Sequence, residues 1–164
     1  MLDPGIELYE EDFKQIDGEL WKLNQLANAK VTFLVDKNGQ LIASVGETQD
    51  LDTTSLASLT AGNIAATGGM AQLLGEKEFS ILFHEGEKDN IHISLIGQRA
   101  ILVVVFDQRS SLGLVRLRVK KCVAVLTNIF TNIINKMNEK TDEMRKQSPF
   151  TEITDEDIEN LFGS

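Results

Sequence analysis

The first apolar residues of the chain recur at three- and four-residue steps. This spacing puts them on one side of a helix, so it predicts a first helix over about residues 8–28. The stripe consists of Phe13, Ile16, Leu20, Leu23 and Ala27.

A strand pattern follows, because apolar and other residues alternate over residues 31–35. Asn38 and Gly39 come soon after it. Asn-Gly is the strongest short hairpin signal, since both residues tolerate a positive φ. With a second strand expected over residues 41–45, the pattern predicts a β-hairpin.

The second helix is predicted from its two ends. Asp52, Thr53 and Thr54 offer N-cap oxygens, and Gly75 supplies a stop after Leu74. The strands expected next cover residues 79–85, 90–95 and 100–106. The last of these is apolar throughout, which predicts a central strand covered on both faces.

A third helix is expected to begin after Ser110 or Ser111 and to carry its apolar stripe for about six turns, to Met137. The predicted order is therefore helix, strand, strand, helix, strand, strand, strand, helix. Hairpin connections dominate this order. The expected fold class is an α/β sandwich with a five-stranded, mainly antiparallel sheet and helices on both faces.

Composition narrows the class of protein. The chain has 164 residues, 42% of them hydrophobic and 25% charged, as is typical of one globular domain. Its apolar runs are too short to span a membrane, and its first residues do not resemble a secretion signal. The single cysteine fits a reducing cytosol, and a net charge of −9 argues against a nucleic-acid partner.

The last residues form a separate acidic segment. We expect one domain over residues 1–146 and this segment over residues 147–164, which holds five acidic residues and no Lys or Arg. Ile158, Leu161 and Phe162 share one face of a short predicted helix, so the segment is expected to order on a partner. The alternative is a disordered tail that only adds solubility.

The sequence offers no catalytic, cofactor-binding or metal-binding set. His84 and His92 lie in neighbouring predicted strands without the further ligands that a metal site needs. Cys122 falls on the apolar stripe of the third helix, which favours a buried thiol. Gly68-Gly69 lies inside a helix and is not followed by Lys-Ser/Thr, so it is no phosphate-binding loop.

The second helix shows two contrasting sides. The large side is expected to pack on the sheet and contains Leu56, Leu59, Asn63, Ala66, Met70, Leu73 and Leu74. The small side is expected to be exposed and contains Ser58, Ala61, Gly62, Ala65, Gly68, Gly69 and Gln72. An exposed helix face normally carries Lys and Glu, and this one carries no charge.

Three glycines inside this helix cost about 1 kcal/mol each relative to alanine. Such a loss indicates that another backbone approaches closely. Two interpretations stay open: a docking surface for a partner protein, or close packing within the fold or against a second copy of the chain.

The third predicted strand is apolar for a sheet edge. Self-association would cover it, and a two-fold homodimer is the simplest arrangement. Its expected interface residues are Phe79, Ile81 and Phe83.

Basic residues gather at the start of the third helix. This run is either a solvated helix face or a contact for an acidic partner or the acidic segment. It consists of Arg109, Arg116, Arg118, Lys120 and Lys121.

Several stretches resemble the Roadblock/dynein light chain family, and within it the MglB-like regulators of bacterial polarity. They cover residues 29–42, 52–63, 83–86, 106–107, 111–118 and 148–162. The resemblance implies a homodimer whose two sheets join edge to edge through the third strand, so that the paired second helices form a platform. It further implies that the platform binds a small Ras-like GTPase (MglA-like), with two of these chains per GTPase, and accelerates GTP hydrolysis.

The same resemblance implies roles for particular residues. The GTPase-binding surface would comprise Thr60, Ala61, Gly62, Ala65, Gly68 and Gly69, with Ile158, Leu161 and Phe162 as a further contact. The GTPase would hold the GTP and Mg²⁺ and supply its own Arg, so this chain would be an activator rather than an enzyme. Arg109 is the loop residue that could contradict this expectation.

The resemblance also implies a cytoplasmic, bacterial protein with a role in cell polarity and gliding motility. The alternative function is a passive Roadblock-type scaffold in a signalling or motor assembly. A ligand-binding module is the least favoured interpretation, because no polar set that would line a pocket is visible in the sequence.

Overall fold

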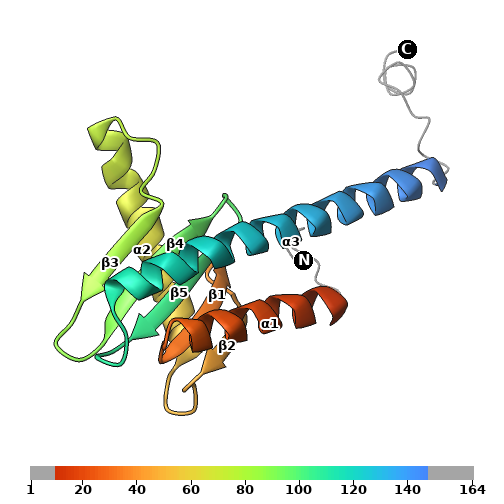
Figure 1. Ribbon diagram of the computed structural model, residues 1–164. Helices are drawn as coiled ribbons and strands as arrows, with labels where there is room; N and C mark the ends of the chain where they lie inside the picture. The colour runs from red at the N-terminus through yellow and green to blue at the C-terminus, as the bar shows by residue number, and fades with distance from the viewer. Residues whose placement is uncertain (1–9, 148–164) are drawn as a thin grey trace. The chain divides into compact units, whose positions relative to one another are not determined.

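A computed structural model describes residues 10–147 of the chain, which form three helices and five strands in the predicted order (Figure 1). The elements are α1 (Glu10–Leu26), β1 (Val31–Asp36), β2 (Leu41–Gly46), α2 (Thr53–Leu74), β3 (Ile81–Glu85), β4 (Asn90–Ile96), β5 (Ala100–Phe106) and α3 (Leu112–Gln147). The chain divides into two compact units: residues 8–129, which hold the sheet, and a second unit that includes α3 from Phe130 onward.

The five strands form one antiparallel sheet in the order β2-β1-β5-β4-β3. All seven residues of β5 are buried, and the strand pairs with β1 on one side and β4 on the other. The prediction of a central, doubly covered strand is therefore confirmed. β2 and β3 form the two edges of the sheet.

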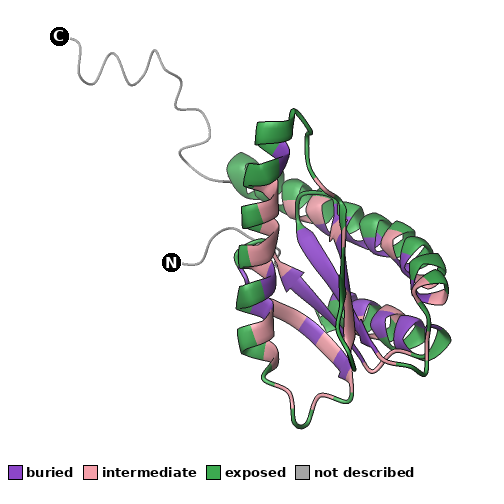
Figure 2. Cartoon of the chain, turned by 90° about the vertical axis from the view of Figure 1, so that its left-hand side faces the viewer, coloured by how far each residue is buried: buried purple, intermediate pink, exposed green. Residues whose placement is uncertain are grey.

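Helices cover both faces of the sheet, as predicted. Figure 2 shows α2 on one side, and α1 and the sheet-covering part of α3 on the other. Under α2, the core contains Phe33, Ile93 and Val103, with Ala57 of the helix buried among them. On the other side, the buried residues of the helices include Ile16, Leu20, Val115, Val119 and Leu126.

The predicted hairpin is confirmed, with a tight turn that depends on glycine. Asp36 Oδ1 accepts hydrogen bonds from the backbone N–H groups of Asn38 and Gln40, both at 2.9 Å. Gly39 has φ +88, and an added Cβ would lie 3.3 Å from the Cα of Ser58 in α2. This glycine is explained by the fold of the chain itself.

Several predicted bounds differ from the structure by one or two residues, and the start of the third strand is one of them. The third strand begins at Ile81, so Phe79 precedes it. The third helix has 36 residues and continues to Gln147, well past the end of its apolar stripe at Met137. Residues 138–147 are polar apart from Met144 and contain neither Gly nor Pro, and good helix formers extend a helix without an apolar pattern.

Candidate functional site

The ends of α2 are fixed as the sequence predicted. Asp52 accepts from the backbone N–H of Ser55 at 3.0 Å and from its hydroxyl at 2.6 Å. These hydrogen bonds from Ser55 lower the pKa of the Asp52 carboxyl. At the other end, Gly75 adopts the left-handed conformation (φ 78) and closes the helix through its N–H to the last turn.

The side of α2 that packs on the sheet is not the predicted one. Ala57, Thr60 and Ala71 are buried there, and Leu56 and Ile64 pack partly against the core. Five residues of the predicted packing side are instead exposed: Ala66, Leu59 (71%), Met70 (57%), Leu73 (88%) and Leu74 (70%).

The physical reason for this error is that α2 contains no charged residue between Thr53 and Leu74. Without a polar face, periodicity does not say which side is buried. Side-chain volume decides instead, because the small Ala57 and Ala71, both 0% exposed, let the helix backbone lie close to the sheet.

The predicted docking residues do not share one environment. Gly62, Ala65 and Gly69 are exposed, while Ala61 and Gly68 are partly buried. Thr60 is 7% exposed, and its hydroxyl donates to the Leu56 carbonyl at 2.7 Å. It therefore lies on the sheet side of the helix.

We define the α2 surface as Leu59, Gly62, Ala65, Gly69, Met70 and Leu73, all exposed on α2. The large members were missed as surface residues because their size favoured the core. The signal that could have identified them is the length of the helix together with its lack of charge. A helix of 22 residues cannot bury every side, so some of its apolar side chains must be exposed. Contiguous exposed apolar area of this kind marks interaction sites.

The glycines of α2 have no packing role within the described chain. A Cβ added at Gly62, Gly68 or Gly69 would meet no atom within 4 Å. Close packing within the fold therefore does not explain them, at least for residues 10–147. A partner protein and a second copy of the chain remain as explanations.

The edge strand β3 also exposes large apolar side chains. Ile81 is 52% and Phe83 37% exposed, and Phe83 stacks on Phe106 with ring centroids 6.1 Å apart. Phe79 is partly buried and lies outside the strand. The remaining contact residues predicted from the sequence, Ile158, Leu161 and Phe162, lie outside the described residues.

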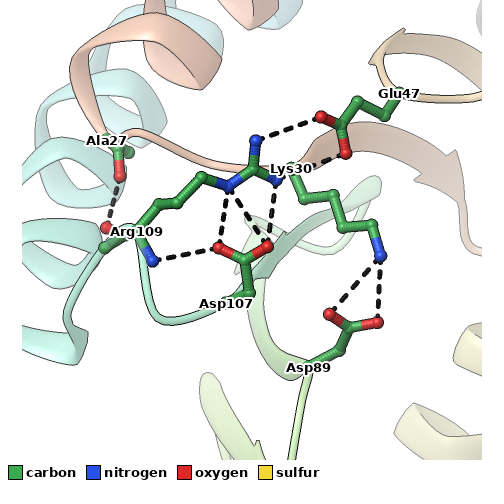
Figure 3. A network of polar contacts seen from close by, with 7 residues as sticks. Ala27, Lys30, Glu47, Asp89, Asp107 and Arg109 are labelled. Atoms are coloured by element: carbon green, nitrogen blue, oxygen red, sulfur yellow. Dashed lines mark hydrogen bonds and ion pairs between the residues drawn. The ribbon is translucent and has the colours of Figure 1, made fainter.

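Arg109 is held by two carboxylates, as Figure 3 shows. Its Nε lies 2.9 Å from Asp107 Oδ1, and its terminal nitrogens lie 3.1 and 3.3 Å from the Glu47 oxygens. The hydrogen bonds from Arg109 lower the pKa of Asp107 to about 2 and lower that of Glu47. They also raise the pKa of Arg109 itself. A second ion pair, Lys30–Asp89 at 3.2 Å, lies nearby.

The other candidates for chemistry are dispersed. Cys122 is buried, and burial raises the pKa of its thiol to about 12, which makes it a poor nucleophile. His84 lies 3.3 Å from the Asn63 amide of α2. Within residues 10–147, no three His, Cys, Asp or Glu side chains group closely enough for a metal ion, and no helix is long and apolar enough to cross a membrane.

The Roadblock/LC7 domain matches residues 18–106, from within α1 to the end of β5. The chain belongs to the Roadblock/LC7 family. A comparison with curated protein sequences gave no significant match.

Three solved structures that are similar to this Roadblock/LC7 chain are all described as MglB. Myxococcus xanthus MglB is 59% identical, with a TM-score of 0.74 over 77% of this chain and 96% of that one. The gliding protein MglB of Thermus thermophilus is 30% identical, with a TM-score of 0.75 over 80% and 99%. A structure described as MglB with a tetrameric arrangement is 30% identical, with a TM-score of 0.76 over 80% of this chain and 99% of that one. The chain is therefore an MglB-like Roadblock protein.

Proposed function

We propose that this chain is a GTPase-activating regulator of a small Ras-like, MglA-like GTPase, and that it does not hydrolyse GTP itself. The observation that carries the proposal is the α2 surface. It is exposed, uncharged and apolar, and its glycines have no packing partner in the described chain. A glycine-bearing helix face lets the backbone of a docked protein approach closely.

A homodimer presents this surface twice. β3 is an edge strand with exposed Ile81 and Phe83, and pairing with a second copy would cover that edge. We propose that two such chains bind one GTPase through their adjacent α2 surfaces, within a Roadblock domain over residues 1–146.

Activation would proceed without an arginine finger. The three guanidinium nitrogens of Arg109 already donate to Asp107 and Glu47, so insertion into a GTPase would break both ion pairs. The dimer would instead bind the hydrolysis-competent switch conformation more tightly than the resting one, which shifts the population toward it.

Residues 147–164 would add a second contact through Ile158, Leu161 and Phe162, in binding or in nucleotide exchange. Deletion of residues 148–164 should then weaken GTPase binding or change the nucleotide release rate while the dimer persists. The setting we propose is the bacterial cytoplasm, in cell polarity and gliding motility. It is supported by similarity to a Thermus protein described as a gliding protein.

The deciding experiment measures GTP turnover by the cognate GTPase with and without this chain. Gly69→Arg should abolish stimulation by steric exclusion. Gly18→Arg is the matched control, because Gly18 is also an exposed helical glycine with no atom within 4 Å of an added Cβ, but it lies on α1. Binding without stimulation would make the chain a scaffold. Equal effects of both variants would remove the α2 surface from the mechanism.

A further inference from the structure

His92 is a buried titratable residue that takes no part in the proposed function. It lies on β4, where it pairs with Phe83 of β3 on one side and Val104 of β5 on the other. Its side chain is 1% exposed. Val119 and Val123 of α3 line the same groove as His92, so the imidazole ring lies between the sheet and this helix.

The ring has a single hydrogen-bonding contact among the described residues. Its Nδ1 lies 3.4 Å from the Oγ of Ser94, and its Nε2 has no partner. A hydroxyl can donate to a bare Nδ1 or accept from a protonated one, so Ser94 suits either form of the ring. A protonated ring has two N–H donors, and the one on Nε2 would have no acceptor. A buried charged group that lacks its hydrogen bond is costly.

The charged side chains that line the groove over the ring, within residues 10–147, are both positive. They are Arg116 and Lys120 of α3. The other lining residues come from β3, β4 and α3 and carry no charge: Ser80, Ile81, Ser94, Leu95, Val119 and Val123. A proton on His92 would therefore add a third positive charge beside two others, without a carboxylate in the groove to offset it.

The sign of the pH effect follows from the neutral ring. Burial, and after it the charge of Arg116, lowers the pKa of His92 in the folded chain, whereas imidazole in an unfolded chain has a pKa of about 6.5. As the pH falls below about 6.5, the unfolded chain binds the proton more readily than the folded one. The folded chain therefore loses stability in that range, and above it the ring is neutral in both states.

We propose that His92 makes the packing of α3 on the sheet sensitive to acid: the helix stays packed while the ring is neutral, and protonation of the ring loosens it from β3 and β4. The cause is a charge that would be buried, incompletely hydrogen-bonded and close to Arg116 and Lys120. The part of α3 that covers the sheet lies on the face opposite α2 (Figure 2). This acid-sensitive contact is therefore separate from the α2 surface.

The test is urea unfolding of the full chain between about pH 7.5 and pH 5.5, where carboxylates with pKa values of about 4 scarcely titrate. As the pH falls below about 6.5, the equilibrium constant for unfolding should increase by up to about tenfold per pH unit, the limit for one proton. His92→Leu should remove this increase. His84→Gln removes the other histidine, which is exposed, and should keep it.

Two charge variants of α3 keep the test decisive if His92→Leu does not fold. Arg116→Glu places a carboxylate at the groove, where it would stabilise the protonated ring, so the pH dependence should become shallower. Lys121→Glu changes the net charge by the same amount, but Lys121 lines a separate groove between α3 and α1. Its pH dependence should match that of the wild type.

NMR spectra of the wild-type chain show whether protonation acts on α3. The methyl resonances of Val119 and Val123 should shift together with the imidazole ¹⁵N resonances of His92. Three results would overturn the proposal: an unchanged pH dependence in His92→Leu, equal pH dependence in Arg116→Glu and Lys121→Glu, or protonation of His92 without any shift of the valine methyls. No GTPase takes part, so the outcome does not depend on the proposed function.

Discussion

The ion pairs of Arg109 limit the part that this residue can take in GTP hydrolysis. An exposed arginine after a central strand could serve as a finger in GTP hydrolysis, but here both of its neighbouring carboxylates bind it (Figure 3). The same ion pairs connect the loop before α2, through Glu47, with the loop before α3, through Asp107. The structure thus gives Arg109 a local structural role.

Arg109→Ala should leave stimulated GTP turnover within a few-fold of wild type, because no guanidinium would be lost from the transition state. An arginine finger is worth about 10³–10⁵ in rate. Turnover of the GTPase under single-turnover conditions distinguishes these cases, with thermal unfolding of the variant as the control for folding. A thousandfold loss in a folded variant would refute activation without a finger.

The lowered pKa of Asp107 predicts that the stability of the fold depends on pH. Its pKa is about 2 in the folded chain, lowered by Arg109, against about 3.9 in an unfolded one. The ion pair therefore stabilises the fold above about pH 4, and this contribution is lost as the pH falls toward about 2.

Asp107→Asn removes this contribution, so its free energy of unfolding should be lower at neutral pH and should fall less steeply between pH 4 and 2. Urea unfolding across that range measures both. Glu76→Gln, which removes one negative charge outside the network, should follow the wild-type curve. If the free energy of unfolding of Asp107→Asn fell between pH 4 and 2 as steeply as that of the wild type, other carboxylates would be responsible for this pH dependence.

At the scale of elements, the sequence predicts a helix or strand well when its ends and its pattern agree. Asp52 and Gly75 bound α2 as expected, Asn38 and Gly39 form the hairpin turn, and the apolar run of β5 is central. Orientation of α2 could not be predicted, since the helix carries no charge to mark its exposed side. The family resemblance was confirmed, while the roles it implies for residues of the α2 surface stay predictions.

His92 and Ser94 line one groove together with Arg116 and Lys120, and this groove could not be predicted from the sequence for a different reason. His92 and Ser94 come from β4, and Arg116 and Lys120 come from α3. Only the packing of the helix on the sheet brings the strand pair and the helix pair together. The spacing of residues along the sequence does not indicate that residues from two different elements lie together.

The glycines of α2 permit a test that separates stability from binding. Gly69→Ala should raise the free energy of unfolding by up to about 1 kcal/mol, because alanine is the better helix former and its Cβ meets no atom within 4 Å. Gly18→Ala should stabilise α1 for the same reason. Denaturant titration of both variants checks this expectation.

Only Gly69→Ala should weaken the complex with the GTPase, since only that position lies on the α2 surface. Titration of each variant with the GTPase measures the difference. Unchanged affinity of Gly69→Ala would mean that no backbone approaches this helix closely, and the glycines would then lack a functional explanation.

At the scale of the whole molecule, the two edges of the sheet differ. The side chains of Ile81 and Phe83 on β3 are each more than one third exposed, whereas every residue of β2 is buried or partly buried. An uncovered apolar edge is a hazard for aggregation. Association through β3, and not through β2, is the arrangement that removes it.

Ile81→Lys should therefore convert the dimer to a monomer, because each copy would bring a lysine to the interface and the two like charges would repel one another. Sedimentation equilibrium measures the change in mass. Ser44→Lys places the same side chain on the other edge strand, β2, and should leave the dimer intact. If Ile81→Lys stayed dimeric, or if Ser44→Lys dissociated equally, the edge-to-edge dimer through β3 would be wrong, and the pairing of two α2 surfaces that follows from it would have to be abandoned.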